Sequence, residues 1–203
     1  MTTEYNDNDT AVPSQRRLQR APDFTGHRLN SFREVALRHG LPGALAAIVL
    51  LAYPGVGLLL DGLSPLAASP LRYLVGGLAI FIALIAYAIW IDRRLEWASV
   101  FWILWLLGIS ISEEWVFRVA MPALGELVAD PRAAVLASNA LFGVIHYFTL
   151  RWKWYWCLGA ALGGMALSRQ YAETGDLALI IAIHWIATFF NTPRMPGMRS
   201  RDA

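Results

Sequence analysis

Long apolar runs separated by short charged stretches are the feature that most limits what this sequence can fold into. The runs cover residues 41–60, 71–91, 97–121, 133–150, 155–168 and 177–191. A helix needs about 20 apolar residues to cross a bilayer, and the first three runs reach that length. In hydrocarbon, backbone N–H and C=O groups must be bonded within the segment, which favours helices. We therefore predict an all-α, polytopic membrane helix bundle with about six transmembrane helices.

Composition agrees with this class and narrows the function. Hydrophobic residues make up 57% of the 203 residues and charged residues 16%, unlike an ordinary soluble domain. Cys157 is the single cysteine, which excludes an intrachain disulfide framework and a CxxC metal site. The arginines flank the apolar runs, where membrane orientation already accounts for them, so nucleic-acid binding is not expected.

The chain is expected to have three parts. Residues 1–40 form a polar, partly disordered tail, residues 41–192 a transmembrane domain, and residues 193–203 a second tail. Within the first tail, Ser31 and Glu34 have the spacing of a capping box. They predict a short helix that either lies at the membrane surface or extends the first span.

The distribution of arginine predicts the orientation. Arg93 with Arg94, Arg151 with Lys153, and both tails fall on one side of a six-span arrangement. Basic loops face the cytoplasm. Both termini should therefore be cytoplasmic, in a membrane that we expect to be a bacterial inner membrane.

Few ionisable residues lie inside the runs. They are Glu113, Glu114, Arg118, His146 and His184, whereas His27 and His39 are placed outside any span. A charged group in hydrocarbon costs at least a few kcal/mol, so each needs a partner or a function.

Adjacent glutamates in the third run should have different partners. On a helix, Glu114 and Arg118 share a face at i,i+4, while Glu113 points about 100° away. An ion pair for Glu114 leaves Glu113 available as a general base. A buried ion network that only fixes helix packing explains the same residues.

Each embedded histidine belongs to a polar stripe. His146 shares a face with Phe142 and Asn139, and His184 shares one with Thr188 and Asn191. Either stripe alone fits a packing role, but two histidines with an unpaired glutamate favour a catalytic site. Span counting nevertheless separates Glu113 and His146 in depth by roughly 10 Å, so a span boundary or the third helix must depart from this scheme.

Other membrane-protease chemistries fit less well. Neither embedded histidine begins an HExxH motif, Gly108 to Ile111 lacks the last glycine of GxSG, and Asp176 lies in a loop. Zinc bound by His146, His184 and Glu113 has acceptable ligand types and stays open, although we expect no metal cofactor.

Three motifs in order resemble the CPBP family of CAAX-processing and bacteriocin-processing membrane proteases, also called the ABI or type II CAAX protease family. They are EExxxR at Glu113 to Arg118, FxxxH at Phe142 to His146, and His184 in the last helix. The resemblance covers residues 97–192. It implies a glutamic protease in which Glu113 activates water with His146, His184 donates to the oxyanion, and Glu114 and Arg118 hold the site together.

One position departs from the family pattern. The last family motif is HxxxN or HxxxD, and this chain has Thr188 there, with Asn191 three residues later. Thr188 or Asn191 would then assist the oxyanion.

The function predicted from these residues is an intramembrane endopeptidase. Its substrate would be a membrane-associated peptide or protein, with or without a lipid anchor. The alternatives are a non-catalytic scaffold or immunity protein of the same family and a small proton or cation transporter.

Overall fold

All described elements are helical. The computed structural model describes residue 29 and residues 31–196, and no strand occurs among them. The all-α prediction is thereby confirmed for this part of the chain, while the predicted disorder of residues 1–28 and most of the C-terminal tail lie outside it. The elements are α1 Phe32–Val35, η2 Ala36–Gly40, α2 Leu41–Leu50, η3 Leu51–Gly55, α3 Val56–Gly62, α4 Ser64–Ala68, α5 Pro70–Asp92, α6 Trp97–Glu114, η4 Trp115–Ala120, α7 Met121–Gly125, α8 Pro131–Thr149, α9 Trp154–Thr174 and α10 Leu177–Asn191.

Three helical segments in the described part of the chain are long and apolar enough to cross a membrane. They are Phe32–Tyr53, Pro70–Asp92 and Trp97–Gly125, and α10 is apolar but shorter. The second segment fully buries only Leu84 and Ala88, and many of its large apolar side chains are exposed, as on a lipid-facing helix. The chain is an integral membrane protein. The count of six spans and the cytoplasmic termini stay predictions.

The first span begins earlier and ends earlier than residues 41–60. Ser31 caps it by accepting a hydrogen bond from the Glu34 amide, and helical dihedral angles continue to Leu50. It breaks at Tyr53, whose φ of −156° and ψ of 126° are extended. Tyr53 precedes a proline, which disfavours the helical conformation. The placement of His39 outside any span was therefore wrong.

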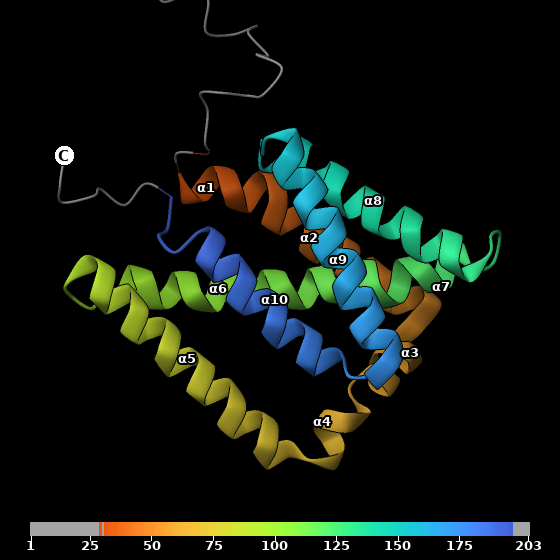
Figure 1. Ribbon diagram of the computed structural model, residues 1–203, viewed down its shortest axis with the longest axis horizontal. Coiled ribbons are helices and arrows are strands. Elements are labelled where there is room, and N and C mark those ends of the chain that lie inside the picture. The colour runs from red at the N-terminus through yellow and green to blue at the C-terminus, as the bar shows by residue number, and fades with distance from the viewer. Residues whose placement is uncertain (1–28, 30, 197–203) are drawn as a thin grey trace, which may run out of the picture.

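The third span extends four residues beyond its predicted end at 121. Helix α6 continues through the π-helical turn η4 into α7, and Figure 1 shows them (green) as one rod across the molecule. Glu113 consequently lies 16 residues after Trp97 and 12 before Gly125, near the middle of the span. This longer span removes much of the depth offset expected between Glu113 and His146.

The last three helices carry the rest of the site. Helix α8 packs on α9, and α10 packs on α6. Helix α9 runs six residues past the predicted end at 168, because Arg169 and Glu173 form an i,i+4 pair at 2.8 Å and polar residues need not end a helix. Gly175, at a φ of 64°, makes the turn, and Asp176 caps α10.

Candidate active site

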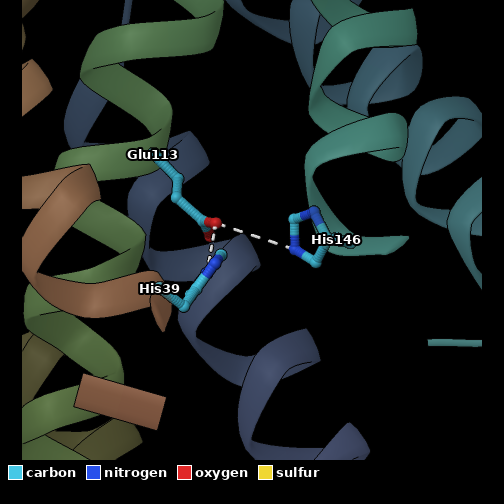
Figure 2. A group of neighbouring side chains, drawn as sticks. All are labelled: His39, Glu113 and His146. Atoms are coloured by element: carbon cyan, nitrogen blue, oxygen red, sulfur yellow. Dashed lines mark ion pairs between the residues drawn. The ribbon is translucent and has the colours of Figure 1, made fainter. Parts of the chain in front are cut away.

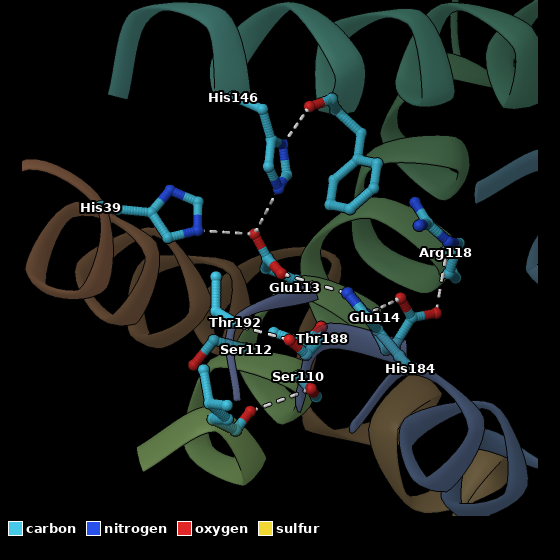
Figure 3. Close-up of polar contacts among 12 residues, drawn as sticks. His39, Ser110, Ser112, Glu113, Glu114, Arg118, His146, His184, Thr188 and Thr192 are labelled. Atoms are coloured by element: carbon cyan, nitrogen blue, oxygen red, sulfur yellow. Dashed lines mark hydrogen bonds and ion pairs between the residues drawn. The ribbon is translucent and has the colours of Figure 1, made fainter. Parts of the chain in front are cut away.

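Three histidine side chains from three elements converge on the buried carboxylate of Glu113. Glu113 of α6 has its Oε1 atom 2.9 Å from His39 Nε2 and 3.6 Å from His146 Nε2. Its Oε2 atom lies 3.5 Å from His184 Nε2. Figure 3 shows the three imidazoles around Glu113. All four residues are at most 9% exposed, so the site is largely shielded from bulk solvent.

The sequence analysis missed His39, which is the histidine nearest to Glu113. It lies in the π-helical turn η2, and its Nδ1 atom is 2.9 Å from Thr149 Oγ1 of α8. The capping box at Ser31 was the signal that could have found it, because a helix that starts there and continues into the first span carries His39 into the bilayer.

The hydrogen bonds at the far side of each ring determine its tautomer. His146 Nδ1 is 2.7 Å from the Phe142 carbonyl, and His184 Nδ1 is 2.6 Å from Glu114 Oε1. A carbonyl oxygen and an ionised carboxylate only accept, so both Nδ1 atoms donate. Thr149 donates its hydroxyl proton to the Ile145 carbonyl and so accepts from His39 Nδ1. Each histidine therefore presents Nε2 to Glu113.

A second layer holds Glu114 in place. Arg118 Nε lies 3.2 Å from Glu114 Oε2, as the i,i+4 spacing predicts, and neither residue is more than 3% exposed. The guanidinium carbon of Arg118 lies 4.4 Å from the centre of the Phe142 ring, and that ring also contacts His146 and His184. Phe142 thus packs between the ion pair and the imidazoles.

The remaining predicted residues differ in their distance from this centre. Asn139 is fully buried and donates to the Val135 carbonyl and to Ser168 Oγ of α9, which ties α8 to α9. Thr188 is partly buried, and Figure 3 draws it on the α10 side of the site. Asn191 is exposed at the end of α10. The roles proposed for all of these residues stay predictions.

A pocket lined by Glu113 lies between the first span, α6 and α8. Its wall on the first span includes His39, Gly43 and Ala46, and Glu113 and Thr149 line the opposite side. Small side chains on the first span leave this room. Glu113 is therefore one of the residues that line this pocket.

The site also has the donor types of a metal centre. The ligand atoms of His39, Glu113 and His146 all lie within 4.8 Å of one another. The sequence left open a zinc site at His146, His184 and Glu113, although no metal was expected, and the structure adds His39 as a nearer neighbour of Glu113.

Comparison with known proteins supports the family predicted from the motifs. Residues 94–190 match the family model described as "Type II CAAX prenyl endopeptidase Rce1-like". The match covers both glutamates, Arg118, His146 and His184, but ends before Asn191 and does not reach His39. No curated protein and no solved structure matches the chain.

Proposed function

Residues 94–190 belong to the Rce1-like family of type II CAAX prenyl endopeptidases, and from this membership we propose that the chain is an intramembrane endopeptidase. Glu113 and His146 activate the attacking water, and His184 stabilises the oxyanion. The observation that carries the proposal is the convergence of the Nε2 atoms of His146 and His184 on the Glu113 carboxylate, within 3.6 Å and 3.5 Å.

The gap between Glu113 and His146 suits a water molecule. At 3.6 Å, Oε1 and Nε2 are too far apart for a direct hydrogen bond. A water about 2.8 Å from both atoms fits between them, held by two acceptors that orient its lone pair toward a substrate. As that water attacks the peptide carbonyl carbon, its proton passes to Glu113. The proton then goes to the leaving amine when the tetrahedral intermediate collapses.

His184 is arranged as an oriented hydrogen-bond donor. Its Nδ1–H is fixed by Glu114, which Arg118 holds in turn, so its Nε2 atom points in a defined direction. In its protonated form Nε2–H donates to the developing oxyanion. A fixed donor in a dry site stabilises such a charge far better than a donor in water. Thr188, in the same helix, is the next candidate donor.

The substrate class follows from the family and from the pocket. The family description names CAAX prenyl endopeptidases, and the pocket wall on the first span includes the small residues Gly43 and Ala46. A membrane-associated peptide can reach Glu113 there from within the bilayer. We place the protein in a bacterial inner membrane.

The test is cleavage of membrane-associated peptides by the purified full chain, with prenylated and unmodified versions of each peptide. Glu113→Gln and His146→Ala should each lower kcat by roughly 10²–10⁴-fold, the usual contribution of acid–base groups. Glu173→Gln, at an exposed surface pair on α9, is the matched control and should leave cleavage unchanged. Undiminished cleavage by folded Glu113→Gln protein would contradict the mechanism.

A further inference from the structure

Three of the four groups in the site form a cluster that extends beyond the family match. Figure 2 shows His39 and His146 approaching the same carboxylate of Glu113 from two sides. Their Nε2 atoms lie 2.9 Å and 3.6 Å from the same oxygen, Oε1. Adjacent ligand atoms around a tetrahedral zinc ion, with bonds of about 2.0–2.1 Å, are separated by roughly 3.3 Å. Both distances to Oε1 are close to this value, and the ligand atoms of all three residues lie within 4.8 Å of one another.

The outer contacts of both rings are those of metal ligands. Histidines that bind metals almost always donate their other N–H to a carbonyl, carboxylate or similar acceptor, which directs the lone pair at the ion. His146 donates Nδ1–H to the Phe142 carbonyl, and His39 donates Nδ1–H to the Thr149 hydroxyl. Neutral His39 and His146 therefore both direct an Nε2 lone pair at Glu113.

Glu113 itself lacks the contact that would satisfy it. Its Oε1 atom is buried and has no hydrogen-bond partner among the described residues. His39 Nε2 lies 2.9 Å away, but a neutral His39 ring that donates Nδ1–H to Thr149 has no proton on Nε2 to give. A buried carboxylate oxygen without a partner is costly. A cation between Oε1 and the two lone pairs would satisfy all three groups at once.

We infer that His39, Glu113 and His146 bind a zinc ion, and that the bound ion inhibits the peptidase. Two imidazoles and one carboxylate match the ligand set of known zinc sites with one open position. That position would face the pocket, which His39 and Glu113 line. Binding itself stands apart from the proposed function, whereas the inhibition rests on it.

Inhibition follows from the use of the same atoms. A bound ion occupies Glu113 Oε1 and His146 Nε2, the two atoms proposed to hold and deprotonate the water. Glu114, the neighbouring carboxylate, is already held by Arg118 and His184. No second carboxylate among the described residues of the site is free to act as the base, so the zinc-bound protein lacks a general base.

Binding is tested on the full chain in detergent by zinc titration against a chromogenic chelator. Cobalt serves as a second probe, with visible absorption bands that report tetrahedral coordination. One zinc per chain is expected, and His39→Ala should weaken binding at least tenfold. Thr149→Val removes the hydroxyl that accepts from His39 Nδ1 and should weaken binding about 10-fold to 100-fold. Thr174→Val is its control, because that hydroxyl also donates to the carbonyl four residues earlier but lies on the exposed end of α9.

Failure of the site and failure of the proposed function give different results. Absence of stoichiometric zinc binding, or equal affinity in wild-type, His39→Ala and Thr149→Val proteins, would overturn the site. A chain that binds zinc but cuts no peptide even when metal-free would leave the site intact and contradict the peptidase. In an active enzyme, zinc should abolish cleavage at concentrations near its Kd, with a matching shift in Thr149→Val. Loss of cleavage on chelation would overturn the inhibitory role.

Discussion

Neighbouring glutamates in this chain have opposite environments, and this decides what each can do. Glu114 is fully buried beside the guanidinium of Arg118, so its charge is compensated by a permanent cation. Glu113 is surrounded by imidazoles, which change their protonation during a reaction. Glu114 is therefore suited to a structural role and Glu113 to proton transfer.

Removal of the Arg118 charge should destabilise the protein. Arg118→Met keeps much of the side-chain volume but leaves Glu114 buried without its cation, which typically costs about 3–5 kcal/mol. The midpoint of unfolding in detergent, followed by circular dichroism, should fall accordingly. Arg169→Met is the control, because Arg169 pairs with Glu173 at the exposed surface of α9, and it should leave the midpoint unchanged. Equal midpoints for all three proteins would show that the buried pair does not stabilise the fold.

The sequence predicts contacts within one helix better than contacts between helices. The pairing of Glu114 with Arg118 follows from the i,i+4 spacing alone, and the structure places them 3.2 Å apart. His39 was missed because Arg33 and Arg38 beside it give that stretch the composition of a polar tail. Its partner Thr149 is 110 residues away, and nothing in the local pattern of either residue indicates the contact.

The helices contain π-helical turns next to prolines, which the pattern of apolar residues does not predict. The turns η2 and η4 each end two residues before a proline, Pro42 and Pro122. A proline removes an i→i−4 hydrogen bond and crowds the preceding turn, and a π-helical turn accommodates both effects. The turn η2 contains His39, and η4 follows directly on Glu114. Helical faces counted at 3.6 residues per turn are therefore shifted close to the site.

Packing of α9 against the ion pair depends on one glycine. A Cβ atom on Gly164 would lie 2.4 Å from Asn139 Oδ1 and 2.8 Å from Arg118 Nη2, whereas one on Gly163 would meet nothing within 4 Å. Gly164→Ala should therefore lower stability by about 1–3 kcal/mol, the usual cost of overpacking, and should also reduce cleavage, because Arg118 orients Glu114. Gly163→Ala is the matched control. Unfolding midpoints and kcat for the two variants test this prediction, and equal effects would contradict it.

At the scale of the whole molecule, hydropathy identifies the helices that face lipid and underestimates those that face protein. Helices α5 and α6 were predicted from their apolar runs and are long and apolar enough to cross the membrane. Helix α8 has 19 residues but is not apolar enough to be identified as a membrane-spanning helix. It buries Ser138, Asn139 and His146 against its neighbours. Its polar residues therefore face the protein interior, and they lower the mean hydropathy of the helix. The number of spans therefore cannot be obtained from hydropathy alone.

The orientation of the third span provides the last prediction. Trp97–Gly125 has 29 residues, which at 1.5 Å per residue is about 43 Å and enough to cross a bilayer. Its ends should therefore lie on opposite sides, with the loop at Arg93 and Arg94 in the cytoplasm. Val128, which is 90% exposed, should lie outside.

Single cysteines test this in a Cys157→Ser background, since Cys157 is the chain's single native cysteine. A membrane-impermeant maleimide should label the Val128→Cys protein in intact cells, and the Arg94→Cys protein only after permeabilisation. The reverse result would invert the orientation and place both loop arginines outside. Labelling of both proteins in intact cells would mean that Trp97–Gly125 does not cross the membrane, and Glu113 would then not be an intramembrane residue.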